Sequence, residues 1–268
     1  MTESFWTRVG LRVASGLVLA FLYLPLIILI VYAFNPSRLQ AWPPTGFTLH
    51  WFAEAAAAPS VREALLNSVL AGLGATGIAL VLGTLAALAV HRFEFFGRET
   101  ISFLFVLPIA LPGVVTGIAL RTTFQTAGVD FGLFTIIVGH ATFCVVIAYN
   151  NVIARLRRLP RTPEEASADL GADTWTTFRR ITLPSIGTAL LSGGLLAFAL
   201  SFDEIIVTNF TAGPGTETIP MWILGAIRRP AELPVVNVVA FVLILVSTIP
   251  VYLAQRISSG GEASSART

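Results

Sequence analysis

The sequence predicts an all-α integral membrane protein with six transmembrane helices. Two observations support this fold class. Of the 268 residues, 55% are hydrophobic and only 12% are charged, whereas soluble domains contain about 25% charged residues. Six long stretches contain no charged residue and together make up about half of the chain. The composition therefore argues against a soluble enzyme.

Each stretch is close to the ~17–25 apolar residues that a helix needs to cross a bilayer. Backbone polar groups find no water in hydrocarbon, so only helices or closed barrels can cross, and continuous apolar runs do not fit a barrel's alternating pattern. The first run is too long for a signal peptide, so we expect it to remain as a span. The expected spans, within a single domain of residues 1–268, are 13–34, 64–90, 100–120, 131–154, 185–206 and 233–255.

The arginine residues predict the orientation. An even number of spans places both termini on one side, and all seventeen basic residues are arginine. Cytoplasmic loops carry most of the positive charge, and the side with the termini holds twelve of the seventeen, so we expect both termini in the cytoplasm. The net charge of +2 then reflects topology and not a nucleic-acid surface. The twelve are Arg8, Arg12, Arg92, Arg98, Arg155, Arg157, Arg158, Arg161, Arg179, Arg180, Arg256 and Arg267.

The chain lacks the sequence motifs of nucleotide hydrolysis, metal binding and nucleophilic catalysis. Without lysine there is no phosphate-binding loop of the Gly-x-x-x-x-Gly-Lys-Ser/Thr type, so ATP-driven transport would need another subunit. Motifs for metal binding or a nucleophile are also missing, and we expect neither catalytic nor metal-binding residues. Gly72, Gly74 and Gly77 match a dinucleotide-binding pattern, but they lie inside an apolar run, where small residues favour close helix packing.

The longest cytoplasmic segment, residues 155–184, has the signals of two short helices. Thr162 is a candidate N-cap, Pro163 fits the first helical position and Glu165 completes a capping box. Gly171 interrupts this helix, and Asp173 is a candidate cap for a second one.

The second helix carries Trp175, Phe178 and Ile181 at three-residue spacing, which gives it an apolar stripe. Such a stripe must be buried, either against the end of the bundle or against a second protein.

The string EASADLGADTWTTFRRITLP (residues 165–184) resembles the EAA loop of the permease subunits of binding-protein-dependent ABC importers. In that family the loop forms the coupling helix that docks on the ATPase subunit, so the resemblance assigns the 163–184 segment to this contact. Ser167 stands where the second alanine is usual, which is a change between small residues. The residues carried over, together with Trp175 from the stripe, are Glu165, Ala166, Gly171, Ala172, Phe178, Ile181, Leu183 and Pro184.

The resemblance extends over nearly the whole chain. Residues 61–99 and 201–220 look like segments of the permeases for spermidine and putrescine, the latter particularly like their second permease subunit. It implies the type I (MetI-like) fold in a bacterial inner membrane. The implied partners are a sister permease, an ABC ATPase dimer that binds ATP and Mg²⁺, an extracytoplasmic solute-binding protein and the lipid bilayer. No cofactor is expected in this chain itself.

Asp203 and Glu204 are the candidate residues of the solute path, near the outer end of the fifth span. Neighbouring helical positions point about 100° apart, so we expect one acid in the path and the other in the bundle. Arg121 is the expected structural partner for either acid, and the competing role for the two acids is attraction of a cationic solute. Tyr149 and Trp222 are aromatic candidates for contacts with protonated amines.

These observations predict the permease subunit of an ABC importer, with polyamine as the expected solute. The alternatives are an ABC permease for another small solute, such as an amino-acid-like compound, an oxyanion or a metal, or a stand-alone secondary carrier. His140, in the fourth span, is either a proton relay or, as we favour, a neutral histidine hydrogen-bonded within the bundle.

Overall fold

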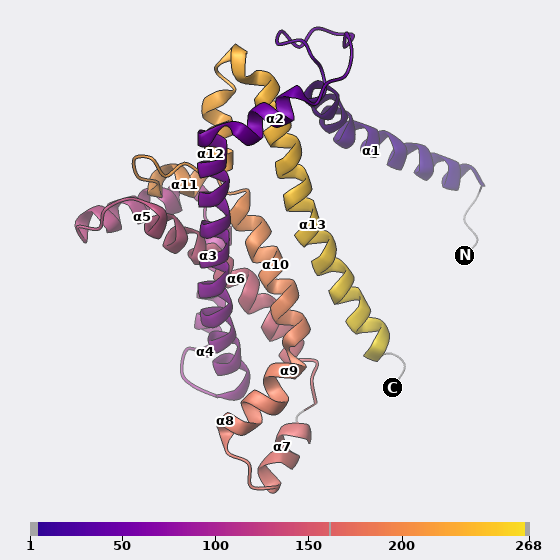
Figure 1. Cartoon of the computed structure of the whole chain (residues 1–268). Coiled ribbons are helices and arrows are strands. Elements are labelled where there is room, and N and C mark those ends of the chain that lie inside the picture. Colours follow the sequence, from indigo (N-terminus) through magenta and orange to yellow (C-terminus); the bar gives the residue numbers. More distant parts are fainter. Residues whose placement is uncertain (1–4, 161, 266–268) are drawn as a thin grey trace. The chain divides into compact units, whose positions relative to one another are not determined.

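The computed structural model describes residues 5–160 and 162–265, and every regular element in these ranges is a helix (Figure 1). Four helices are long and apolar enough to cross a membrane, and a bent pair makes a fifth if it is counted as one span. The all-helical membrane fold is thus confirmed, whereas the expected number of six spans is not reached by length and composition. The four are α1 (Phe5–Ala33), α3 (Pro59–Arg92), α6 (Leu133–Leu156) and Pro230–Arg256, most of it in α13 (Leu233–Ser265).

The third expected span, 100–120, is divided between two helices, α4 (Arg98–Ala110) and α5 (Gly113–Thr126). Leu111 has extended backbone angles, φ −80° and ψ 140°. Because a residue before proline is disfavoured in the α region, Pro112 accounts for the break. The predicted span is therefore not one continuous helix in the structure.

The fifth expected span, 185–206, is also shorter than predicted. Its helix, α10 (Gly187–Phe202), ends at Phe202, and a separate short helix, α11 (Ile206–Thr211), follows. At its start, α10 is bent by 64° from the preceding helical segment, residues 174–185. The uncharged run itself ends at Phe202, and the prediction extended the span past Asp203 and Glu204, which separate α10 from α11.

The chain divides into two compact units, residues 1–62 with 222–244 and residues 63–221 with 245–268. The first contains α1, α2 (His50–Ala57), the short η2 helix (Pro230–Glu232) and most of α12 (Ile219–Ala226). Within it, Trp51 Nε1 donates a hydrogen bond to the Asn35 carbonyl at 2.8 Å. A single domain over residues 1–268 stays a prediction.

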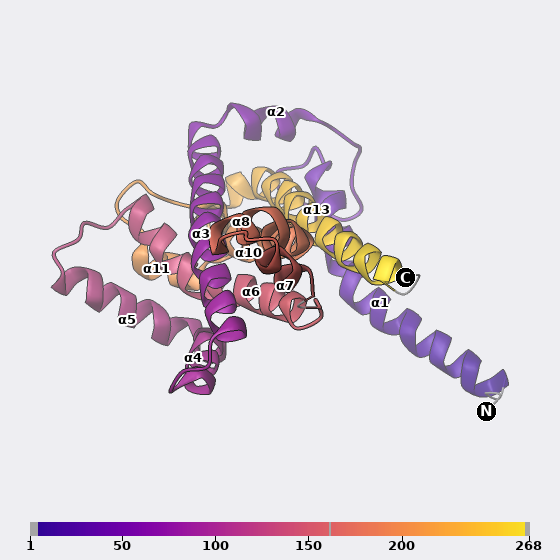
Figure 2. The same cartoon turned by 90° about the horizontal axis from the view of Figure 1, so that it is seen from below.

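The core of the second unit is built from small and aliphatic side chains. Helices α6 and α10 pack side by side (Figures 1 and 2), and α4, α5 and α11 pack on α6. Glycines of α3 allow close approach, since a Cβ at Gly72 would lie 2.8 Å from the Phe198 ring and one at Gly74 2.9 Å from Ile137. The packing interpretation of these two glycines is therefore confirmed.

The segment between α6 and α10 forms a compact helical loop at one end of the second unit (Figure 1). Its elements are α7 (Thr162–Asp169), α8 (Thr174–Thr177), a π-helical turn η1 (Phe178–Thr182) and α9 (Leu183–Ser185). This segment holds most of the residues for which a function is predicted.

Candidate functional site

Helix α7 ends in a motif that only glycine forms without strain. Gly171 has φ +78°, in the left-handed region. Its N–H donates to the Ala168 carbonyl at 2.9 Å, and the Ala172 N–H donates to the Ser167 carbonyl at 3.1 Å. These are the two hydrogen bonds of a Schellman motif. The predicted interruption at Gly171 is confirmed.

The second helix of the loop is capped as the sequence indicated. Asp173 Oδ1 accepts a hydrogen bond from the Thr176 N–H at 2.7 Å, and α8 begins at Thr174. Hydrogen bonds from Thr176 lower the pKa of Asp173, as is usual for a carboxylate that accepts donors. Beyond Thr177 the backbone widens into the π-helical turn η1, which the sequence did not indicate.

A hydroxyl pair joins the two helices of the loop. Ser167 and Thr177 are both buried, and their side-chain oxygens lie 2.9 Å apart. The serine at the usual alanine position therefore makes a specific contact, so its hydroxyl is used in this chain. This pair gives the loop an internal support independent of any partner.

The apolar residues of the loop are only partly covered in the structure. Leu170 is 89% exposed and Trp175 is 66% exposed. The Trp175 ring lies 5.6 Å from that of Phe178, which is half-buried. Of the other predicted contact residues, Ala172 and Ile181 are half-buried, whereas the exposed ones are Glu165, Ala166, Gly171 and Pro184.

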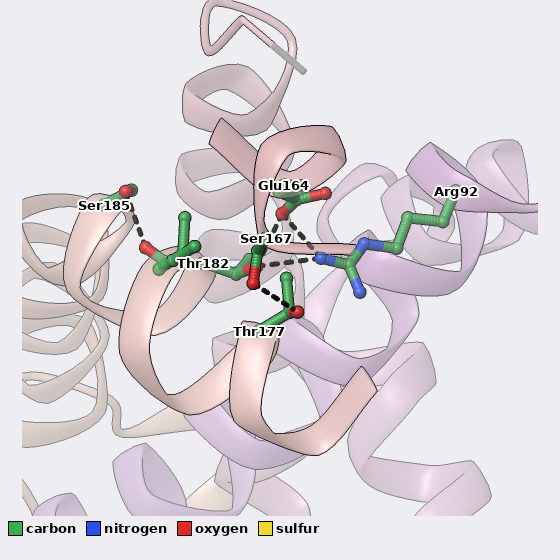
Figure 3. A network of polar contacts seen from close by, with 7 residues as sticks. Arg92, Glu164, Ser167, Thr177, Thr182 and Ser185 are labelled. Atoms are coloured by element: carbon green, nitrogen blue, oxygen red, sulfur yellow. Dashed lines mark hydrogen bonds and ion pairs between the residues drawn. The ribbon is translucent and has the colours of Figure 1, made fainter. Parts of the chain in front are cut away.

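A three-residue polar network ties the loop to the end of α3 (Figure 3). Arg92 Nη2 donates to Glu164 Oε1 at 2.6 Å and to Thr182 Oγ1 at 2.8 Å. The Thr182 hydroxyl donates to the same Glu164 oxygen at 2.5 Å. Each member thus contacts the other two, and the three come from α3, α7 and η1.

The electrostatics of this network favour an ionised Glu164. Burial acts to raise its pKa, but hydrogen bonds from Thr182 and Arg92, and the nearby charges of Arg92 and His91, act in the opposite direction. The net result is a pKa below the ordinary value. An open cavity of about 400 Å³ lies beside the pair and is lined by residues from α3, α7 and α8.

The two candidate acids lie at the opposite end of α10 from the loop, and the structure gives them different surroundings. Glu204 is half-buried, and its Oε1 accepts a hydrogen bond from the Val207 N–H at 2.8 Å, so it caps α11. Asp203 is exposed at the C-terminus of α10. This contact lies at the junction between α10 and α11.

The expected ion pair of Arg121 with one of these acids is not what the structure shows. The Arg121 guanidinium lies 5.2 Å from the centre of the Phe131 ring, and its Nη1 donates to the Phe210 carbonyl at 3.5 Å. Arg121 thus contacts an aromatic face and the C-terminal end of α11, where a positive charge is favourable. Arg121 therefore does not serve as the expected ion-pair partner of Asp203 or Glu204 in the described structure.

His140 is fully buried between three helices. Its Nδ1 lies 2.7 Å from Ser201 Oγ on α10, and its Nε2 lies 2.7 Å from Thr208 Oγ1 on α11. Both ring nitrogens therefore have hydroxyl partners, which supports the favoured interpretation of a hydrogen-bonded histidine within the bundle.

The two aromatic candidates for the solute path are core residues. Tyr149 is 3% exposed, and its ring stacks on Phe105 with centroids 5.0 Å apart. Trp222 is 5% exposed, and its Nε1 donates to Ser60 Oγ at 3.2 Å in the first unit. Each has a structural role in this conformation, and their contact with solute stays a prediction.

The described residues contain no group of three or more His, Cys, Asp or Glu side chains that could hold a metal ion. Nothing in the sequence indicated two members of the polar network, Arg92 and Thr182. Arg92 was counted only as a charge that sets orientation. It lies 72 residues from Glu164, so no local spacing rule connects the two.

The all-helical membrane bundle and its capped, glycine-broken loop belong to a transport permease, as the comparison with known families shows. Residues 79–260 match the family described as "Binding-protein-dependent transport system inner membrane component". The chain belongs to this family. It is accordingly a multi-pass inner-membrane protein and a transport permease, and the family is not one of enzymes.

Within the family, the chain is homologous to polyamine permeases. It is 37% identical to the putrescine transport system permease protein PotI of Escherichia coli K12, over 82% of this chain and 80% of PotI. It is 32% identical to the spermidine/putrescine permease protein PotC of the same strain, over 89% of this chain and 90% of PotC. The putative 2-aminoethylphosphonate permease protein PhnV of Salmonella typhimurium is 30% identical over 81% of this chain and 82% of PhnV.

Solved structures share the fold. A chain of a bacterial ABC transporter involved in the import of alginate aligns with a TM-score of 0.73 at 15% identity, covering 96% of this chain and 99% of that one. A chain of the MetNI methionine ABC transporter aligns with a TM-score of 0.52 at 14% identity, covering 75% of this chain and 99% of that one. Both are ABC importers, and the likeness establishes the type I permease fold.

Proposed function

We propose that this chain is one of two permease subunits of an ATP-driven importer and that the pair forms a path for polyamines. The solute assignment is supported by the 37% identity to a putrescine permease over most of both chains. A separate ATPase dimer would bind ATP and Mg²⁺, and a soluble extracytoplasmic protein would deliver the solute. The permease would expose its path outward when the ATPases engage and inward when they separate.

The observation that carries the coupling to an ATPase is the exposure of the loop. Leu170 and Trp175 present large apolar surfaces, although the frame beneath them is capped and internally hydrogen-bonded. A rigid helical loop with uncovered apolar side chains is suited to a partner's groove, because packed helices move as units. We therefore call residues 155–184 the coupling loop, with Glu165 and Trp175 at the ATPase contact.

The proposed orientation follows from the arginine distribution. The coupling loop and both termini would face the cytoplasm, where positively charged loops are enriched. Two of the twelve arginines on that side, Arg161 and Arg267, lie outside the described residues. Asp203, at the far end of α10, would then face the extracytoplasmic side.

Asp203 is our candidate for attracting the cationic solute. It is exposed, whereas Glu204 is engaged in capping α11. Recognition of a polyamine requires negative charge, and weak contacts suit passage better than a deep cage. The proposal thus keeps the prediction that only one of the two acids serves the path.

The decisive test compares the chain alone with the assembled complex in liposomes. We expect uptake of labelled putrescine or spermidine only when the ATPase, the sister permease and the binding protein are present with ATP. Uptake by this chain alone, driven by an ion gradient, would identify a secondary carrier instead. Transport of another solute but no polyamine would favour the second candidate, a permease for a different small molecule, for which the likeness to PhnV is the supporting observation.

Two variants test the assigned residues. Trp175→Asp should abolish capture of the ATPase on a tagged chain, whereas Phe47→Asp, at an 81% exposed site outside the coupling loop, should not. Asp203→Asn should lower polyamine uptake several-fold. Glu204→Gln is its matched control, since the amide oxygen still accepts from Val207 and keeps the cap of α11.

A further inference from the structure

The Arg92–Glu164–Thr182 network is the point where the coupling loop meets a helix from another part of the chain. Arg92 is the last residue of α3, Glu164 lies in the first turn of α7, and Thr182 ends the π-helical turn. The three contacts of 2.6, 2.8 and 2.5 Å close a triangle (Figure 3). The loop is thereby fixed to α3 at two of its own elements.

This contact between the coupling loop and α3 is made by charged and polar side chains. Arg92 and Glu164 are only partly exposed, at 23% and 32% of their side-chain surface. A charge-assisted hydrogen bond is directional and stronger than a neutral one, whereas apolar contacts permit sliding. The closed triangle therefore resists rotation of α7 about the end of α3.

A second contact fixes α9, which directly follows the π-helical turn, to α6. Arg155 Nε donates to the Ser185 carbonyl at 3.1 Å, and the Ser185 hydroxyl donates to the Ile181 carbonyl at 2.6 Å. The turn that leads into α10 is thus attached to α3 through Thr182 and to α6 through Ser185. A displacement of the loop has a polar route into α3 and α6 in addition to the covalent route into α10.

We propose that Arg92, Glu164 and Thr182 form a brace that makes α3 move with the coupling loop, so that ATP-driven movement of the loop reaches α3 directly. The three are positioning residues, since they need not touch solute or nucleotide. The inference rests on the proposed function, because it presumes an ATPase that moves the loop. It adds a route of coupling through α3 that depends on Arg92, a residue outside the coupling loop.

The test measures coupling in the assembled transporter, reconstituted in proteoliposomes with the binding protein and putrescine. The readout is the amount of putrescine imported per ATP hydrolysed, together with capture of the ATPase and the melting temperature of the complex. Arg92→Gln should keep capture and melting temperature but lower the import per ATP by about fivefold or more, the usual lower range for coupling between sites. Thr182→Val should act in the same direction, and Thr182→Ser, which keeps the hydroxyl, should not.

Exchange of the charges provides the rescue. The double variant Arg92→Glu with Glu164→Arg should recover most of the import per ATP that each single variant loses. Arg157→Gln, which removes an exposed arginine at the end of α6, is the charge-matched control and should couple normally. If Arg92→Gln does not assemble, Arg92→Lys and Thr182→Val decide the question by the same ratio.

Two results would overturn the brace. One is an unchanged import per ATP in both Arg92→Gln and Thr182→Val. The other is a loss of uptake that parallels a loss of assembly while the ratio stays constant, which would make the network purely structural. If the wild-type complex fails to import putrescine with ATP, the proposed function itself is contradicted, and this outcome is distinct from both.

Discussion

The core of the second unit and the coupling loop at its end are held together by different interactions. In the core, His140 binds two hydroxyls at 2.7 Å each, and helices approach closely at glycines. In the coupling loop, the contacts are an ion pair, a side-chain cap and a glycine in the left-handed region. Neutral groups therefore hold the core, whereas the coupling loop adds charged contacts, where water is within reach, to its neutral Ser167–Thr177 pair.

The difference follows from the cost of burying charge. An ion in hydrocarbon is costly, so helix association in membranes relies on small residues and on neutral hydrogen bonds. At a half-exposed loop, water reduces this cost and leaves the directional benefit of an arginine–carboxylate contact. We infer that changes in the core alter stability first, whereas changes in the loop alter coupling first.

Gly83 tests the core most severely. A Cβ at this position of α3 would lie 2.8 Å from the Tyr149 backbone nitrogen and 3.0 Å from the Val145 carbonyl oxygen. Backbone atoms cannot rotate away, so Gly83→Ala should destabilise the protein by about 3 kcal/mol, at the upper end for an overpacked core. The measurement is the midpoint of denaturant unfolding of purified protein in detergent.

Gly77 is the matched control on the same helix. Nothing lies within 4 Å of a Cβ at Gly77. Gly77→Ala should therefore be neutral or stabilising by about 0.5–1 kcal/mol, because alanine is the better helix former. Equal destabilisation by the two substitutions would contradict the packing assigned to α3.

His140→Ala is expected to have the next largest effect. The change leaves the Ser201 and Thr208 hydroxyls without their buried partner and opens a cavity, at a cost of about 2 kcal/mol. Thr122→Ala is the control, since that exposed hydroxyl bonds only to the Ile118 carbonyl of its own helix. Thermal unfolding should separate them clearly, and loss of transport by His140→Ala at full stability would revive the proton-relay alternative.

The sequence was informative where a signal is local. Apolar runs located the long helices, Gly171 and Asp173 marked the two ends within the coupling loop, and the loop pattern indicated the family. It was uninformative where partners are distant. Nothing in the residues around Arg92 indicates Glu164, and Ser167 was judged a neutral replacement although it binds Thr177.

Helix ends inside predicted spans were the other failure. The break at Leu111 falls within an uncharged segment that hydropathy treats as continuous, whereas α10 ends at Phe202, the last uncharged residue before Asp203. Pro112 accounts for the first boundary, and Glu204, whose Oε1 accepts from the Val207 N–H, marks the second; both are local signals. A rule that searches predicted spans for proline and for capping acids would have found both boundaries.

Gly171→Ala tests the coupling loop without touching the core. At φ +78°, an alanine has its Cβ too close to the following carbonyl, which costs about 1 kcal/mol in the left-handed region. We expect reduced ATPase capture with little change in the unfolding midpoint of the bundle. Gly187→Ala, at the start of α10, has open space around its Cβ and no positive φ, so it should leave capture unchanged. Equal capture by both variants would argue that the loop tolerates other end geometries.

The smallest expected effect is a pH dependence of the brace. Burial alone would raise the pKa of Glu164, but the hydrogen bonds from Thr182 and Arg92 outweigh it and lower the pKa below its ordinary value of 4.5. Because the folded state then binds the proton less readily than the unfolded state, Glu164 stabilises the fold above pH 4.5, and this contribution is lost as the pH falls through the lower, folded-state pKa. The melting temperature of the wild type should therefore fall more steeply between pH 5 and pH 3 than that of Glu164→Gln, which keeps a hydrogen-bonding group but does not titrate.

Asp173→Asn is the comparison within the same loop. Thr176 lowers the pKa of Asp173 in the same direction, but at a fully exposed cap, where solvent screens the effect. Identical pH profiles for the wild type and Glu164→Gln would show that the charge of Glu164 contributes nothing to the brace, and the contact with Arg92 would then be ordinary packing of the kind that holds the core.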